Sequence, residues 1–144
     1  ITPPDNAADN TILIVDDEAV NRLVLKSILK LHKYHVIEAA SSREALEQFE
    51  TGESIDLVVM DVMMPKMTGF DACKLIRERF SYVSLPIIFL TAKSTEDAIV
   101  DSFEAGGNDF MTKPANKIEL LVRVASLLNQ SKSCVNPLLE QQKK

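Results

Sequence analysis

Acidic side chains stand at two points of this sequence where an apolar run ends. Asp16, Asp17 and Glu18 follow the first such run, and Asp61 follows the third. If both runs are strands of one sheet, these carboxylates would converge and repel one another strongly unless a cation lies between them. A ligand set made only of oxygen atoms favours Mg²⁺ with several bound waters. The simpler alternative is that Asp16 only caps a helix, with its two neighbours favouring the helix dipole, but Asp61 on a second run favours the metal.

A hydroxyl and a lysine stand at the ends of two later runs. Thr91 closes the fourth run, and Lys113 follows the fifth, directly before Pro114. The lysine could form a plain salt bridge with the acids, or it could hold an incoming anion. A metal, a lysine and a hydroxyl around one carboxylate are the groups needed to place a phosphoryl group and to neutralise its charge. Asp61 would then be a nucleophile that forms an acyl phosphate.

Five short apolar runs alternate with segments of helical period, and these elements must position the polar side chains. Most runs are apolar throughout, as expected of strands buried on both faces of a parallel sheet. Right-handed crossovers then place helices on both faces and bring the chemistry to the carboxyl ends of the strands. The expected strands are Thr11–Val15, His35–Ala39, Asp56–Met60, Pro86–Leu90 and Asp109–Thr112.

The helical segments predict which faces pack on this sheet. The expected core residues of the first helix are Val20, Leu23, Val24, Ile28 and Leu31, and those of the last are Ile118, Leu121, Val122, Ala125 and Leu128. Helix ends carry their own signals, because capping pairs precede a helix and glycines with positive φ follow one. These signals are Ser41 with Glu44, Ser94 with Asp97, Asn116 with Glu119, and the glycines Gly52 and Gly106.

The composition is that of one soluble globular domain. The chain has 144 residues, of which 46% are apolar and 26% are charged. The 16 basic and 21 acidic residues give a net charge of −5, which argues against a nucleic-acid-binding surface or a polybasic membrane anchor. No apolar run approaches the roughly 18 residues of a membrane span. Neither a signal peptide nor a disulfide or zinc pattern is visible, so we expect a cytoplasmic setting.

Both ends of the chain have the composition of linkers. Residues 1–10 are polar and rich in proline, residues 131–144 are polar and interrupted by Pro137, and the expected domain is 11–130. The chain begins with Ile1 instead of methionine, which suggests a piece of a longer protein.

Four segments together resemble the receiver domain of two-component response regulators. They are ILIVDDEAVNR (12–22), DLVVMDVMMPKMTGFD (56–71), PIIFLTAK (86–93) and DFMTKP (109–114). The resemblance covers 11–130 and implies an α/β, flavodoxin-like, doubly wound parallel sheet of five strands in the order 2-1-3-4-5 with five helices. It also implies a signalling module instead of an enzyme. The phosphoryl donor would be a histidine kinase or a histidine phosphotransfer domain, and Mg²⁺ would be the cofactor.

The resemblance assigns a role to each candidate residue of the metal and acceptor site. Asp61 matches the phosphoacceptor, Asp17 the direct Mg²⁺ ligand, and Asp16 the acid that usually acts through water. The main-chain carbonyl of Met63 would be a further ligand.

Other positions match the groups that hold the phosphate and report its presence. Lys113 matches the phosphate-binding lysine, Thr91 the switch hydroxyl and Phe110 the switch aromatic. Pro65 and Gly69 match the loop after the acceptor, where a turn and a positive φ are expected.

Two further predictions concern phosphate lifetime and output. Met63 and Lys93 stand where the family's side chains flank the path of the hydrolytic water, and both types predict slow self-dephosphorylation. In the last helix, Leu120, Val124 and Leu127 form a second apolar stripe. With Phe110, this stripe is expected to pack on a partner copy or a neighbouring domain.

Three alternatives have weaker support. A Mg²⁺-dependent aspartyl-phosphate phosphatase would have DxDx[TV] after its first strand, whereas this chain has DDEAV. A nucleotide-binding domain would need GxGxxG or GxxxxGK[ST], and neither is present. His32 and His35 have the spacing of a metal pair but lack a third ligand, so we expect them to be turn residues. For the whole protein, a hybrid kinase or multidomain regulator is favoured over a stand-alone regulator.

Overall fold

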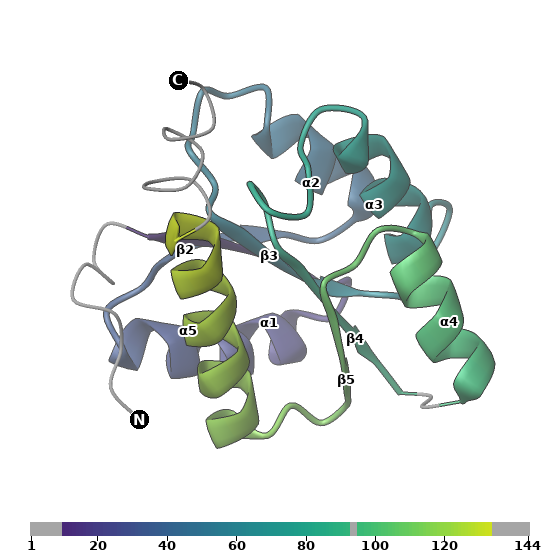
Figure 1. The fold of residues 1–144 in the computed structure, drawn as a ribbon. Helices are drawn as coiled ribbons and strands as arrows, with labels where there is room; N and C mark the ends of the chain where they lie inside the picture. The colour runs from purple at the N-terminus through teal and green to yellow at the C-terminus, as the bar shows by residue number, and fades with distance from the viewer. Residues whose placement is uncertain (1–9, 93–94, 134–144) are drawn as a thin grey trace.

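The computed structural model describes residues 10–92 and 95–133, which alternate between strand and helix along their whole length (Figure 1). The elements in chain order are β1 (Thr11–Val15), α1 (Ala19–Leu31), β2 (His35–Ala39), α2 (Ser42–Gln48), β3 (Leu57–Asp61), α3 (Gly69–Arg77), β4 (Ile87–Thr91), α4 (Glu96–Glu104), β5 (Asp109–Thr112) and α5 (Lys117–Ser133). The last helix continues beyond the expected boundary at residue 130. None of the described helices combines the length and apolar composition that crossing a bilayer requires.

The five strands form one parallel sheet in the order β2-β1-β3-β4-β5, which confirms the predicted topology. Three strands have the predicted bounds, whereas β3 and β4 each begin and end one residue later than expected. Asp61 and Thr91 are therefore the last residues of their strands, paired with Leu90 and Thr112. This shift places both polar side chains at the carboxyl edge of the sheet.

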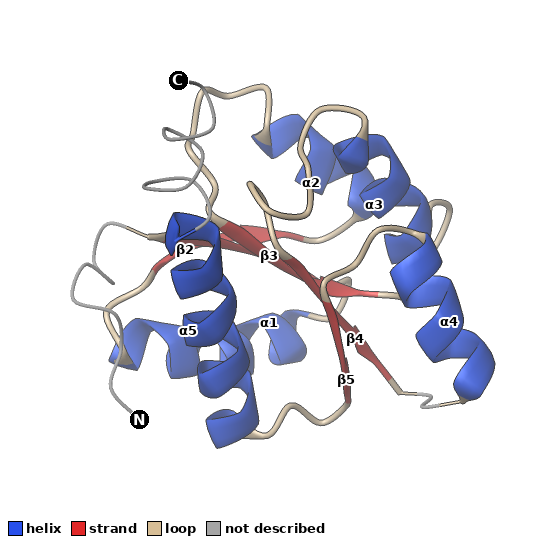
Figure 2. Cartoon of the chain, in the orientation of Figure 1, coloured by secondary structure: helices blue, strands red, loops and turns tan. Residues whose placement is uncertain are grey.

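Helices cover both faces of the sheet, as Figure 2 shows: α1 and α5 lie on one face, and α2, α3 and α4 lie on the other. Two apolar clusters fill the spaces between the layers. The first joins Ile12, Ile14 and Val59 to α1 and α5, and the second joins Leu13 and Val58 to α2 and α3. Successive residues of a strand point to opposite faces of the sheet and pack in different clusters, which is why the strands are apolar throughout.

The predicted core face of α1 is wrong for four of its five residues. Val20 is 71% exposed and Leu23 is 62% exposed, and Val24 and Leu31 are exposed as well. The residues that pack on the sheet are Leu25, Leu29 and, in part, Ile28. The sequence contains two apolar stripes side by side, and the longer stripe faces solvent.

The prediction for α5 is also partly wrong. Leu120 and Val124, expected on an outward stripe, are fully buried in the core with Leu121 and Leu128. Conversely, the list of expected core residues contains two that are largely exposed, namely Ile118 and Val122. Because α5 is apolar on almost every side, its periodicity does not distinguish these two faces.

Most helix-end predictions hold. The Ser41 hydroxyl accepts from the Glu44 amide at 3.1 Å, and the Asn116 side chain accepts from the Glu119 amide at 2.9 Å. Gly52 and Gly106 have φ of +86° and +105°. The exception is α4, which is capped by Thr95 through the Ala98 amide, while Ser94 lies outside the described residues.

The remaining side chains of interest have ordinary environments. His35 is exposed and His32 is half-buried at the end of α1, and the described residues contain no metal cluster that includes either. Cys73 is buried in the α2 and α3 cluster, where burial raises the pKa of its thiol to about 11. It is therefore an inert core residue at neutral pH.

Candidate functional site

Four polar residues converge at the carboxyl edge of the sheet from four strands. Asp16 directly follows β1, Asp61 and Thr91 end β3 and β4, and Lys113 directly follows β5. The strand pairing brings these ends together, because β1, β3, β4 and β5 are successive neighbours in the sheet. Residues far apart in sequence thus meet where a doubly wound sheet holds its ligands.

The Lys113 ammonium bridges two carboxylates. Its Nζ lies 3.0 Å from Asp16 Oδ2 and 3.1 Å from Asp61 Oδ1. The side chains of Asp16 and Asp61 are only 1% and 6% exposed, and that of Lys113 is 21% exposed. The site therefore holds two buried acids against one cation, which leaves a surplus negative charge where water is largely excluded.

The electrostatics of Asp61 and Lys113 follow from this arrangement. Burial raises the pKa of the Asp61 carboxyl, and the Asp16 charge adds to this, while the hydrogen bond and the charge of Lys113 offset it in part. Burial alone would lower the pKa of Lys113, but its hydrogen bonds to Asp16 and Asp61 outweigh burial and raise it. Lys113 is consequently charged at neutral pH. An additional positive charge near Asp61 would stabilise its ionised carboxylate.

The acid run beside this pair has the donor set of a hard-cation site. Carboxylate oxygens of Asp16, Asp17 and Glu18 lie within 4.8 Å of one another, with Asp16 buried and the other two exposed. Asp61 is tied to the same place through Lys113. Oxygen ligands, surplus negative charge and one open side fit a hydrated divalent cation such as Mg²⁺. The structure thus brings Asp16 and Asp61 together as predicted, and Asp17 directly follows Asp16 in the chain.

Asp16 does not cap α1 in the way considered from the sequence. Glu18 occupies the N-cap position, and it makes no side-chain cap hydrogen bond. The Asp16 carboxylate instead accepts from the Glu18 amide at 2.9 Å through Oδ1, and its Oδ2 binds Lys113.

The loop after Asp61 is held close to the acceptor by Gly69. The expectation of a positive φ at this glycine is wrong, since the loop residue with positive φ is Lys66, at 71°. Gly69 is required for a different reason: a Cβ there would lie 2.2 Å from the main-chain oxygen of Asp61. Its amide donates to the Val62 carbonyl at 2.8 Å, so α3 begins directly against the end of β3.

Three of the four residues predicted to act as switch and lifetime groups, namely Thr91, Phe110 and Met63, belong to the described part of the chain. Thr91 is buried and its carbonyl accepts from the Lys113 amide at 2.7 Å, while Phe110 is half-buried against the cluster of α2 and α3. The main-chain amide of Met63 donates to the Asp61 carboxylate, and Met63 is 64% exposed. Lys93 lies outside the described residues.

Sequence reasoning missed two residues that support the site. The Ser42 hydroxyl, at the start of α2, is buried and donates to the Met67 carbonyl at 2.8 Å, which anchors the acceptor loop. Arg22 donates to the main-chain carbonyl of Asp16 at 2.8 Å. A sequence signal that could have found Arg22 is its position on a helix face that otherwise packs on the sheet, namely the face of Leu25 and Leu29.

A small cavity of about 280 Å³ adjoins the acid and lysine pair. Apolar side chains of α1 and of the segment after β5 form most of its wall, and Asp16 and Lys113 stand at one side. Its lining residues are Asp16, Asn21, Val24, Leu25, Leu90, Lys113, Pro114 and Ala115. The site is thus open toward α1.

The fold and the site define a doubly wound α/β domain with an acid and lysine centre, and comparison with known proteins identifies its family. The family model for the response regulator receiver domain matches residues 12–125. The chain is 41% identical over 122 residues to the transcriptional regulatory protein YvrH of Bacillus subtilis, covering 84% of this chain and 50% of that protein. The chain therefore belongs to the receiver domains of two-component response regulators.

Solved structures agree with this assignment. A probable two-component system response regulator/GGDEF domain protein matches with a TM-score of 0.83 and 30% identity, over 88% of this chain and 52% of that one. The signal receiver domain of a signal transduction histidine kinase from Syntrophus aciditrophicus matches with a TM-score of 0.75 and 34% identity, over 88% and 92% of the two chains. The chain spans about half the length of the curated relatives it matches.

Proposed function

We propose that this receiver domain accepts a phosphoryl group on Asp61 from the phosphohistidine of a histidine kinase or a histidine phosphotransfer domain. The observation that carries the proposal is the buried Asp61 carboxylate at a strand end, bridged through Lys113 to a second buried acid. A purely structural domain would gain nothing from two buried carboxylates that share one ammonium, because their mutual repulsion lowers stability.

The chain's own groups account for the transfer step. An Asp61 carboxylate oxygen attacks the phosphorus, the bond from phosphorus to the imidazole nitrogen breaks, and its electron pair stays on the imidazole. The Lys113 ammonium is close enough to Asp61 to pair with a phosphoryl oxygen as negative charge shifts toward the acceptor. Mg²⁺, held by Asp16, Asp17, Asp61 and the Met63 carbonyl, would neutralise the phosphoryl charge when bound.

The phosphorylated state would be read by the groups next to Asp61. Thr91 ends the neighbouring strand and would turn its hydroxyl toward the phosphate, and Phe110 on β5 would respond to that movement. Slow hydrolysis of the acyl phosphate would reset the domain, so the domain turns over its own phosphate without acting as an enzyme on other substrates. The output is a shift between two conformations.

The context of the whole protein is part of the same proposal. A hybrid kinase or a multidomain regulator fits the relatives, which include a histidine kinase receiver and a GGDEF domain protein, and a stand-alone regulator is the second choice. We propose a cytoplasmic setting. Curated relatives such as YvrH are named transcriptional regulatory proteins, and we propose that any contact of the whole protein with DNA lies outside this acidic domain. Leu127 and Phe110, both half-buried, remain candidates for a contact with a neighbouring domain, whereas the buried Leu120 and Val124 do not.

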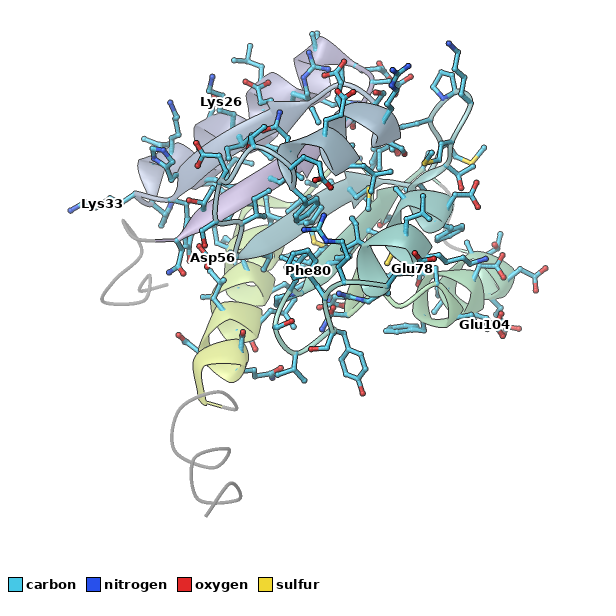
Figure 3. All side chains as sticks on the ribbon, turned by 90° about the horizontal axis from the view of Figure 1, so that it is seen from above. Lys26, Lys33, Asp56, Glu78, Phe80 and Glu104 are labelled. Atoms are coloured by element: carbon cyan, nitrogen blue, oxygen red, sulfur yellow. The ribbon has the colours of Figure 1, made fainter. Side chains whose placement is uncertain are left out.

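Acetyl phosphate with Mg²⁺ tests the acceptor directly. The intact chain should gain about 80 Da, the mass of one phosphoryl group, and Asp61→Asn should gain none because an amide is not a competent nucleophile. Asp56→Asn is the matched control: Asp56, labelled in Figure 3, directly precedes β3 and accepts from the Thr11 amide, so its loss should leave the adduct intact. A full equivalent on Asp61→Asn would overturn the assignment. Many turnovers per chain in place of one stable adduct would favour the phosphatase alternative.

A further inference from the structure

Arg22, near the start of α1, contacts the main chain of the acidic segment 16–18. Its Nη1 donates to the main-chain carbonyl of Asp16 at 2.8 Å, and its own amide donates to the Glu18 carbonyl at 3.2 Å. Its Nε donates to Glu38 Oε1 at 3.2 Å, and the side chain is only 18% exposed. One largely buried guanidinium therefore ties the loop between β1 and α1 to the neighbouring strand β2.

The contacted carbonyl controls where the next side chain leaves the main chain. The Asp16 carbonyl and the Asp17 amide belong to one planar peptide unit, so a fixed carbonyl also fixes the orientation of Asp17 at its nitrogen. The Asp16 amide is held as well, since it donates to the Ala39 carbonyl at 3.1 Å. The exposed Asp17 side chain thus projects from a main chain that is held on both sides of Asp16.

Glu38 keeps the Arg22 guanidinium in place. It lies on β2 opposite Ile14 of β1, and its two oxygens bind Arg22 at 3.2 Å and Lys26 at 3.1 Å. The hydrogen bond from Lys26, followed by the other contacts with Lys26 and Arg22, lowers the pKa of this carboxyl against the effect of burial. Lys26, labelled in Figure 3, stands one turn further along α1 and donates to the second carboxylate oxygen of Glu38.

We propose that Arg22 is a positioning residue for the Mg²⁺ ligands, which it serves by fixing the peptide unit between Asp16 and Asp17, with Glu38 as its anchor. This inference rests on the proposed function. Only arginine satisfies the geometry, because its planar fork offers separate donors to a carbonyl on one side and a carboxylate on the other.

Charge and geometry make opposite predictions for this residue. Arg22 is a cation close to the acid run, so if only its charge mattered, its removal would strengthen Mg²⁺ binding. If it positions the ligands, its removal would weaken binding, by the tenfold or more that the loss of an outer-shell partner typically costs. The sign of the change therefore distinguishes positioning from simple electrostatics.

A calorimetric titration of the intact chain with Mg²⁺, without any phosphodonor, tests the proposal. Arg22→Ala should weaken Mg²⁺ binding by about tenfold, and Arg22→Lys should recover only part of the loss. Lys26→Ala is the matched control: it removes a cation that binds the same Glu38 but not the Asp16 carbonyl, and it should bind Mg²⁺ as well as the unchanged chain or better. Unchanged or tighter binding by Arg22→Ala would overturn the proposal.

A second variant and a second readout keep the test independent of folding and of the proposed function. Glu38→Gln retains Arg22 but loosens its anchor, and it should weaken Mg²⁺ binding in the same direction by a smaller factor. With saturating Mg²⁺, Arg22→Ala should still form the full adduct with acetyl phosphate, because Asp61 and Lys113 are intact. Adduct formation by the unchanged chain and by Arg22→Ala, with equal Mg²⁺ affinity in both, would reject the positioning role alone. A chain that neither binds Mg²⁺ nor forms the adduct would reject the proposed function with it.

Discussion

The two edges of the sheet both bury charge, but they balance it differently. At the carboxyl edge, Asp16 and Asp61 share the single ammonium of Lys113. At the amino edge, the half-buried guanidinium of Arg77 donates to neutral acceptors only, within the part of the chain that the structure describes. These acceptors include the carbonyls of Gly106 and Leu85, each at 2.7 Å, and the Asn108 side chain at 2.8 Å.

This difference separates stability from chemistry. Arg77 joins the end of α3 to the segments before β4 and β5, and each of its three guanidinium nitrogens donates to a neutral acceptor there, so this cation holds segments of the fold together. The carboxyl edge keeps an unmatched negative charge even with Lys113 in place, and an added cation would compensate it. We infer that substitutions at the amino edge change the free energy of unfolding, while substitutions at the carboxyl edge change binding and reactivity first.

The largest stability effect is expected at the amino edge. Arg77→Ala removes one donor from each of several carbonyls and from the Asn108 side chain, which should lower the free energy of unfolding by about 3 kcal/mol. Urea unfolding measures it. Arg79→Ala is the control, because Arg79 pairs with Glu50 at the surface and should cost at most about 1 kcal/mol. The folded Arg77 variant should still form the adduct at Asp61. A loss below 1 kcal/mol, or loss of the adduct in folded protein, would remove the distinction between the two edges.

A glycine at the carboxyl edge should affect both properties. Gly69→Ala forces a Cβ against the Asp61 carbonyl, which is main chain and cannot move aside cheaply, so we expect a loss of about 2–3 kcal/mol and slower adduct formation. Gly52→Ala is the control, because Gly52 has φ of +86° but open space around it, and should cost only about 1–2 kcal/mol with normal phosphorylation. Equal phosphorylation rates in the two variants would show that the close approach at Gly69 does not position Asp61.

The lifetime of the acyl phosphate should respond to side chains and not to stability. Met63→Asn with Lys93→Glu places polar groups where a hydrolytic water must be held, and the half-life should shorten by one to two orders of magnitude, or about 1.4–2.7 kcal/mol in the barrier. The measurement is the loss of phosphate after the donor is removed. Met63→Leu, which keeps an apolar side chain, should leave the half-life unchanged. Decay of the unchanged domain within seconds would contradict the prediction.

The smallest expected effect is a gain of stability from removing the acceptor. Burial raises the folded-state pKa of Asp61, so the folded state binds the proton more tightly than the unfolded state. The stabilising contribution of this proton is therefore present at low pH and is lost as the pH rises through the folded-state pKa, which lies above the ordinary value of 3.8. Asp61→Asn avoids the loss and should stabilise the fold by about 1 kcal/mol at pH 7, and by less at pH 4. A difference that is constant between these pH values would contradict the assigned cause.

The strands and the polar residues at their ends were predictable from the sequence because their signals are local. Apolar runs flanked by Asp16, Asp61, Thr91 and Lys113 indicate buried strands with polar ends, whatever the rest of the chain does. One-residue shifts in β3 and β4 do not disturb this pattern, because Asp61 and Thr91 still lie at the carboxyl ends of these strands.

The core face of α1 was not predictable because polar residues interrupt its periodicity. Asn21 and Arg22 lie on the face that continues to Leu25 and Leu29; Asn21 lines the cavity, and Arg22 donates to the Asp16 carbonyl. Two polar residues at the start of the core face made the exposed stripe look like the better one. In α5 the reason is different, because apolar residues on almost every side leave the choice of face to tertiary packing.

The close fit around Gly69 has a mechanical consequence. The turn that follows Asp61 is fastened at three places: the Val62 amide to the Leu90 carbonyl, the Gly69 amide to the Val62 carbonyl, and the Ser42 hydroxyl to the Met67 carbonyl. A phosphoryl group added to Asp61 is therefore next to a turn that these hydrogen bonds hold in place on the α3 side. We expect the groups that move on phosphorylation to lie on the opposite side, toward Thr91 and β5. The rigid turn thus determines in which direction the conformational change spreads.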